Sequence, residues 1–185
     1  MMLAPLTELT KRLWRDQKGL SAIEFALIAP VMILIYFGLV EFSQAYMAER
    51  RASHAASIVA DLVAQSGGTS RKDLDSTFML GDTVMQPFAP GDLSIRVSSV
   101  TVDSHGVATV EWSQANGRNL RRREPDSRID DLPSGLIEAK ETLILGETEY
   151  RYPLFIPAAF WTELTFKRRY YLRPRSMDRI ACSDC

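Results

Sequence analysis

The feature that most constrains the fold is a run of 21 residues, 20–40, in which every position is apolar or small except Ser21 and Glu24. As an α-helix it would extend about 31 Å, close to the hydrocarbon thickness of a bilayer. Nothing else in a chain of 185 residues is large enough to cover such a segment on all sides as a buried core helix. A secretory signal peptide fits less well, because its apolar core is shorter and a small-x-small cleavage site should follow. The block therefore predicts a transmembrane helix.

The charges that flank this block predict its orientation. Four basic residues precede it and two follow it, and the basic side of a single span normally stays in the cytoplasm. The residues are Lys11, Arg12, Arg15 and Lys18 before the block, and Arg50 and Arg51 after it. We expect a cytoplasmic N-terminus, with most of the chain on the other side of the membrane.

Three residues at the start of the block are unusual for a simple anchor. Glu24 lies about one helical turn inside the apolar stretch, where an unpaired charge costs roughly 2.5 kcal/mol or more. Pro30 removes a backbone donor within the helix, and Gly19 stands at the border between basic and apolar residues. One interpretation of Glu24 is that its side chain reaches back to the headgroups, and this interpretation needs no partner.

The segment from Gly19 to Pro30 resembles a known signature. A glycine, four residues, then a glutamate and the aromatic Phe25 at the head of an apolar helix match the type IV prepilin pattern. The Glu-Phe-Ala-Leu stretch with a proline shortly after is similar to the TadE/TadF-like pilus assembly proteins of tight-adherence (Flp, type IVb) systems. The resemblance is clearest over residues 16–62.

The resemblance implies a mechanism. A prepilin peptidase would cut after Gly19, so that Leu20 becomes the new N-terminus and Glu24 the fifth residue of the mature chain. In pilin-like assemblies a glutamate at that position meets the free ammonium of a neighbouring subunit, so that two groups costly in lipid neutralise each other. The implied partners are the peptidase, other pilin-like subunits and the pilus assembly machinery, in addition to the lipid bilayer. The implied location is the inner membrane with a periplasmic C-terminal domain, and the pilus itself is the alternative location.

The helix is predicted to continue beyond the membrane. No helix breaker lies between residue 41 and the Gly67-Gly68 pair, so it should run over residues 20–66. Small residues recur on one face of its exposed part at spacings of three and four, and we name this face the alanine stripe: Ala45, Ala48, Ala52 and Ala55, continued by Val59 and Leu62. Small residues let another helix approach closely, which favours contact with neighbouring subunits. Packing on the protein's own β-sheet is the equal alternative.

The remaining sequence predicts an α+β domain. Residues 69–90 indicate a second, shorter helix with Ser70 as its N-cap, and residues 134–140 indicate another short helix. Alternating apolar residues predict a hairpin of strands 93–102 and 108–112 around the turn 103–106, with a bulge at Ser98-Ser99 where the phase slips. Two more strands are expected at 142–152 and 164–172. A long helix followed by short helices and an antiparallel sheet of about four strands is also the general layout that the pilin-like resemblance implies.

The expected organisation has four parts. They are a cytoplasmic leader (1–19), a transmembrane helix (20–40), a helical stalk (41–66) and an extracytoplasmic α+β domain (67–185).

Residues 153–161 form a stretch without a charge, which we expect to be a loop because it contains two prolines. It follows Tyr150-Arg151-Tyr152-Pro153, a pattern similar to one in TadE-like proteins. Such an apolar segment either fills the core or contacts the membrane interface or a partner. We favour contact, through Phe155, Ile156, Phe160 and Trp161.

The composition argues against other classes of function. With 22 basic and 23 acidic residues the chain has no net field to attract nucleic acid, and we interpret Arg121-Arg122-Arg123 as part of a solvated loop. Cys182 and Cys185 lack the further ligands of a zinc site, and we expect a terminal disulfide loop or a link to another subunit. No nucleophile elbow, zinc helix motif or phosphate loop is present, so we expect no catalytic residue, metal or cofactor. The alternative to a pilin-like component is an unprocessed single-pass anchor that carries a binding or scaffold domain.

Overall fold

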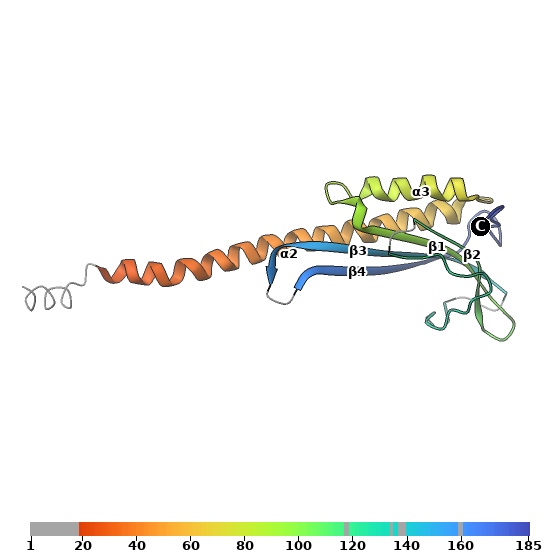
Figure 1. Ribbon diagram of the computed structural model, residues 1–185. Coiled ribbons are helices and arrows are strands. Elements are labelled where there is room, and N and C mark those ends of the chain that lie inside the picture. The colour runs from red at the N-terminus through yellow and green to blue at the C-terminus, as the bar shows by residue number, and fades with distance from the viewer. Residues whose placement is uncertain (1–18, 117–118, 134, 137–139, 159–160) are drawn as a thin grey trace, which may run out of the picture. The chain divides into compact units, whose positions relative to one another are not determined.

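The structure is a computed structural model, and it describes residues 19–116, 119–133, 135–136, 140–158 and 161–185. The chain divides into two compact units, Met1–Ser43 and Gln44–Cys185, which we describe separately. Helix α2 (Leu20–Gln65) begins in the first unit and continues into the second (Figure 1). Its bounds agree with the predicted helix over 20–66 to within one residue, and Pro30 lies inside it without ending it.

The second unit is an α+β domain, as the sequence predicts. Four strands form one antiparallel sheet in the described residues, in the order β2-β1-β3-β4. They are β1 (Leu93–Val102), β2 (Ala108–Ala115), β3 (Thr142–Ala158) and β4 (Trp161–Leu172). The expected turn between β1 and β2 is present, with Gly106 at a φ of 80° and the Asp103 carboxylate accepting from the backbone N–H of His105 and Val107.

Helix α3 (Arg71–Val84) is the predicted second helix, shorter than expected. Ser70 caps it: the backbone N–H of Asp73 donates to the Ser70 hydroxyl, and that hydroxyl donates to the Asp73 carboxylate. The helix ends before Pro87, and a short 3-10 helix η2 (Pro90–Asp92) leads into β1. Leu74 and Phe78 of α3 are buried in the core.

Both faces of the sheet are covered by apolar contacts. On one face the part of α2 within the domain and α3 pack against residues such as Ile95, Val97, Ile144 and Tyr150, as the layers in Figure 1 show. On the other face Val100 and Val110 pack with Leu145 and with Ile129 from the connection between β2 and β3. The domain therefore has three layers.

The predicted bulge at Ser98-Ser99 is misplaced. Strand β1 pairs with β3 without a shift from Leu93 to Thr101, so β1 itself is regular. The apparent slip in the sequence arises because the apolar residues of β1 change from one face of the sheet to the other. Ile95 and Val97 face the helices, whereas Val100 and Val102 face the opposite side, where Ile129 packs. The irregularity lies between β1 and β2, where Ser99 pairs with Trp112 and Val100 with Val110, so the extra residue is on β2.

The prediction that residues 153–161 form a loop is wrong for the described part of that segment. Strand β3 continues through Pro153 to Ala158, and β4 begins at Trp161. The register of β3 with β1 ends at the pair Leu93–Tyr150, so in the described residues the end of β3 pairs with β4 alone. A proline is tolerated in such a position, because a strand with one unpaired edge does not need every backbone donor. The predicted helix over 134–140 lies mostly outside the described residues.

Candidate membrane anchor and the surfaces of the domain

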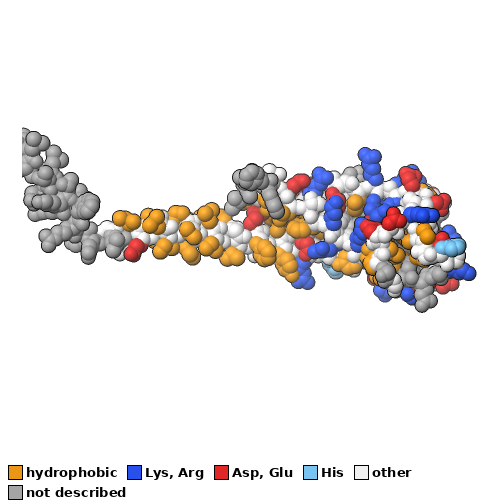
Figure 2. All heavy atoms as spheres, turned by 90° about the horizontal axis from the view of Figure 1, so that it is seen from below, with side chains coloured by type: hydrophobic (Ala, Val, Ile, Leu, Met, Phe, Trp, Pro, Cys, Tyr) orange, Lys and Arg blue, Asp and Glu red, His pale blue; other side chains and the backbone are white. Residues whose placement is uncertain are grey.

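The first unit presents an apolar helical surface. From Ser21 to Val40 every side chain is exposed except that of Ala29, which is half-buried. Among the described residues α2 is the helix long and apolar enough to cross a membrane: its most apolar window has a mean hydropathy of 2.3, and none of that window is buried. Figure 2 shows apolar side chains along this segment. Exposed leucine, isoleucine and phenylalanine side chains at this density are incompatible with water, and the segment is a single-pass membrane anchor by its length and composition.

The candidate processing residues lie at the start of this surface. Gly19 directly precedes α2 and is exposed, and a Cβ placed on it would meet no described atom within 4 Å. Glu24 and Phe25 are also exposed, on the first turns of the helix. The fold of the described residues therefore does not require a glycine at position 19. The Glu24 side chain is accessible, because no described side chain covers it.

The four alanines and Val59 of the alanine stripe are buried within the domain, whereas Leu62 at its end is 42% exposed. Ala48 and Ala55 are 0% exposed, and Ala45 and Ala52 are also buried in the cluster that joins α2 to the sheet. Of the two alternatives, packing on the protein's own β-sheet is the one observed, and the interpretation of these four alanines as an intersubunit contact is wrong. Their small side chains allow α2 to approach the sheet closely. The same close approach is found at Gly146 of β3, which faces Ala56 and Ala60 of α2.

The aromatic segment is described only in part. Phe155 is 84% exposed near the end of β3, whereas Leu154 beside it packs against the core. The side chains of Ile156, Phe160 and Trp161 lie outside the described part, so their expected contact with a membrane or partner stays a prediction.

A buried carboxylate forms the strongest polar cluster in the domain, and the sequence analysis missed it. Glu147 of β3 is 4% exposed; its carboxylate accepts from Arg96 Nε at 2.6 Å and from Arg123 Nη2 at 3.0 Å, and Arg169 Nε lies 3.3 Å away. Arg169 also donates to Asp131. Burial alone would raise the pKa of Glu147, but the hydrogen bonds from Arg96 and Arg123 and their positive charge hold it below its usual range.

This cluster revises the interpretation of the triple arginine. Arg123 turns toward the sheet and pairs with Glu147, so only its neighbours Arg121 and Arg122 are exposed as expected for a solvated loop. The alternation of β3 offered one signal: Glu147 stands between Leu145 and Glu149, both of which are buried. The partners of that carboxylate come from distant segments and could not be read from the sequence.

At the C-terminal end Cys182 and Cys185 are joined by a disulfide. The segment is held to the domain by the indole N–H of Trp112, which donates to the Ile180 carbonyl at 2.8 Å, and by a backbone bond from Thr69 to Ala181. Both cysteines pack against the apolar core between the helices and the sheet, so the disulfide has a structural role.

The described residues thus define a class: a single-pass membrane protein whose long N-terminal helix continues into an α+β domain. A model of the TadE-like protein family matches residues 19–61, a match that begins at Gly19 and covers most of α2. This confirms the resemblance over that segment, and the family suggests a component of pilus assembly in tight adherence. No curated protein and no solved structure matches the chain.

Proposed function

We propose that the protein is a minor pilin-like component, a pseudopilin, in the assembly of a tight-adherence type IVb pilus. In this proposal a prepilin peptidase removes residues 1–19, and Leu20 becomes the N-terminus of the mature chain. The protein acts as a structural subunit and not as an enzyme, without a metal or cofactor. Its partners are other pilin-like subunits and the assembly machinery.

The observation that carries the proposal is the position of Glu24. Glu24 is an exposed acid on an apolar helix, and no part of the most hydrophobic window of that helix is buried. It stands five residues after Gly19, the residue at which the TadE-like match begins. A carboxylate in lipid is costly unless a cation meets it. Cleavage after Gly19 would create such a cation, the ammonium of Leu20, on every subunit. Subunits packed side by side would then pair the two groups.

The proposed topology places the N-terminus in the cytoplasm and the domain in the periplasm. The surplus of basic residues before the span supports this orientation. The disulfide between Cys182 and Cys185 supports it as well, since disulfides persist in oxidising compartments such as the periplasm. The proposed parts are the leader 1–19, the span 20–40, the stalk 41–66 and the domain 67–185, although the stalk is packed on the sheet and does not stand free of it.

Cleavage is tested by intact-mass measurement of the protein from its native membrane. We expect a chain that begins at Leu20, and a Gly19→Leu variant that retains residues 1–19. Gly38→Leu is the matched control, because Gly38 is also an exposed glycine of this unit with no described neighbour within 4 Å of a Cβ. A wild-type chain that keeps its leader would refute processing and favour the unprocessed anchor.

The role of Glu24 is tested separately. A Glu24→Gln variant keeps the shape of the side chain but has no negative charge to neutralise an ammonium, so we expect normal cleavage with strongly reduced pili on the cell surface. Ser21→Ala, a change at the other polar position of the span, should leave pili unchanged. Normal piliation by Glu24→Gln would contradict the pairing even if cleavage occurs.

A further inference from the structure

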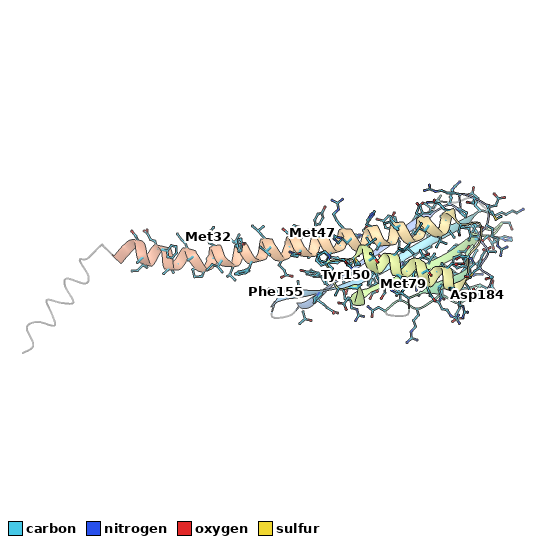
Figure 3. The ribbon with its side chains drawn as sticks, turned by 90° about the horizontal axis from the view of Figure 1, so that it is seen from above. Met32, Met47, Met79, Tyr150, Phe155 and Asp184 are labelled. Atoms are coloured by element: carbon cyan, nitrogen blue, oxygen red, sulfur yellow. A yellow bond between two sulfur atoms is a disulfide. The ribbon has the colours of Figure 1, made fainter. Side chains whose placement is uncertain are left out.

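The end of the β3–β4 hairpin extends past the rest of the sheet. Strand β1 pairs with β3 no further than Tyr150, and beyond that residue the described sheet consists of β3 and β4 only. These two strands pair regularly as far as Pro153–Glu163 and, after an irregularity in the register, again at Ala158–Trp161. Phe155 lies on this extension and is 84% exposed. In Figure 3 its label stands at the end of the hairpin, beyond that of Tyr150.

This extension points toward the end of the domain at which α2 enters it. Three polar contacts align β4 and the segment after it with α2: Arg168 with Glu49 at 2.6 Å, Tyr170 with Ser53 at 2.5 Å, and Arg175 with Asp61 at 2.7 Å. Both partners advance together in residue number, so β4 runs in the same direction as α2. The first residue of β4 therefore lies toward Gln44, the first residue of the domain.

The hairpin also reaches beyond Gln44. From Arg168 back to Trp161 the strand covers about 23 Å at 3.3 Å per residue. From Glu49 back to Gln44 the helix covers only about 8 Å at 1.5 Å per residue. The hairpin end therefore projects about 15 Å past the start of the domain's helix.

Chain connectivity places a bilayer close to this end. Only residues 41–43 separate the proposed span from Gln44, and even fully extended they hold the two within about 14 Å. The same end of the domain carries exposed apolar side chains on α2, at Tyr46 (52%) and Met47 (45%). A hairpin that projects about 15 Å from this end is therefore long enough to reach the bilayer.

The chemistry of the hairpin fits a lipid interface. Residues 153–161 contain no charge and include three aromatic residues, and aromatic side chains favour the boundary between headgroups and acyl chains. Three basic side chains flank this stretch in sequence and are about half exposed or more: Arg151 on β3, and Lys167 and Arg168 on β4. Arg151 stands four residues before Phe155 in the sequence, at most about 14 Å away, and its long side chain suits contact with phosphate headgroups when Phe155 is immersed.

We infer that the end of the β3–β4 hairpin inserts into the interface of the outer leaflet of the membrane that α2 spans, with Phe155 as an immersed side chain. The domain then has two attachments to the bilayer, the helix and the hairpin, and its sheet is held at the membrane surface. This inference rests on the membrane span of the proposed function but not on cleavage after Gly19.

Photocrosslinking on the full chain tests the inference. A benzophenone amino acid replaces Phe155, and in a matched control it replaces Met177, which is 57% exposed at the opposite end of the domain, next to Ser176 whose hydroxyl donates to the Gln65 carbonyl. The purified proteins are reconstituted in vesicles of phosphatidylethanolamine and phosphatidylglycerol, irradiated and weighed intact. We expect an added phospholipid mass at position 155, with a yield several-fold above that at position 177.

The outcomes separate the alternatives. Equal lipid adducts at the two positions, or none at 155, would overturn the inference. Irradiation of native membranes should again give a phospholipid adduct at 155; a protein adduct there in its place would identify a protein partner and also overturn it. Repeating the experiment in Gly19→Leu distinguishes this inference from the proposed function, because the adduct should form whether or not residues 1–19 are removed.

Discussion

Gly146 of β3 lies where α2 approaches the sheet closely, and its substitution tests the packing of the domain. A Cβ added at this position would lie 2.7 Å from the Ala60 Cβ and 3.3 Å from the Ala56 carbonyl oxygen. Carbon atoms in contact are normally about 3.5–4.0 Å apart, so helix and sheet would have to separate by nearly 1 Å. The Ala56 oxygen belongs to the backbone and cannot turn away.

The expected cost follows from these distances. Overpacking of a core costs about 1–3 kcal/mol, and the lower flexibility of alanine in the unfolded chain offsets roughly 0.5–1 kcal/mol of it. Gly146→Ala should therefore destabilise the domain by about 1–2 kcal/mol. For a domain of this size the midpoint of thermal unfolding falls by about 2–4 °C per kcal/mol, so we expect a decrease of about 2–8 °C.

The assay is thermal unfolding of the full chain in detergent micelles, followed by near-UV circular dichroism, to which the buried Trp112 contributes. The double variant Gly146→Ala/Ala60→Gly removes the clashing methyl group and should be more stable than the sum of the single changes predicts, by about 0.5 kcal/mol or more. Gly67→Ala, at an exposed glycine with free space around it, is the control. An unchanged midpoint in Gly146→Ala, or strict additivity in the double variant, would show that α2 does not lie this close to β3.

Further predictions concern three polar contacts in the same domain. Glu147→Ala should lower the free energy of unfolding in urea by about 3 kcal/mol, because Arg96, Arg123 and Arg169 would lose the carboxylate that they share. Since the pKa of Glu147 is lowered on folding, its contribution to stability is present above the usual pKa of a glutamate, about 4.3, and is lost on further acidification; Glu147→Gln should flatten this decline in acid-unfolding curves. Trp112→Phe should cost about 1–3 kcal/mol, because the Ile180 carbonyl loses its donor, and should expose the C-terminal segment to proteolysis. Arg168→Ala should change stability by less than about 1 kcal/mol, since the Arg168 side chain is half exposed; a larger loss in thermal unfolding would contradict that ranking.

Local signals in the sequence predicted the elements of the fold. The glycine pair after Ser66 and the absence of breakers from residue 41 onward predicted the end of α2, and the Ser70–Asp73 pair predicted the start of α3. These features act through backbone hydrogen bonds within a few residues, so no knowledge of the rest of the chain is needed. Alternation in the strands likewise predicted the antiparallel sheet.

The errors arose where the answer depends on distant segments. The prolines at 153 and 157 seemed to exclude a strand, but β3 has no described partner on the β1 side beyond Tyr150 and so tolerates them. The spacing of the alanine stripe predicted a buried face and could not say what would cover it. Glu147 is paired with arginines that lie 51 and 24 residues away in sequence, separations at which no sequence pattern identifies partners.

The burial of the alanine stripe changes where contacts between subunits should be sought. Because Ala48 is fully buried in the domain, Ala48→Leu must disturb the packing of α2 on the sheet and should lower the unfolding midpoint before it affects any assembly. Ala26 offers the contrast, since it lies on the apolar helix of the first unit and is exposed in the single chain. Ala26→Leu should leave the midpoint unchanged, and if neighbouring subunits pack along this helix it should reduce pilus assembly. A pair of results with the opposite pattern, in which Ala48→Leu folds normally but fails to assemble, would return the alanine stripe to the subunit interface.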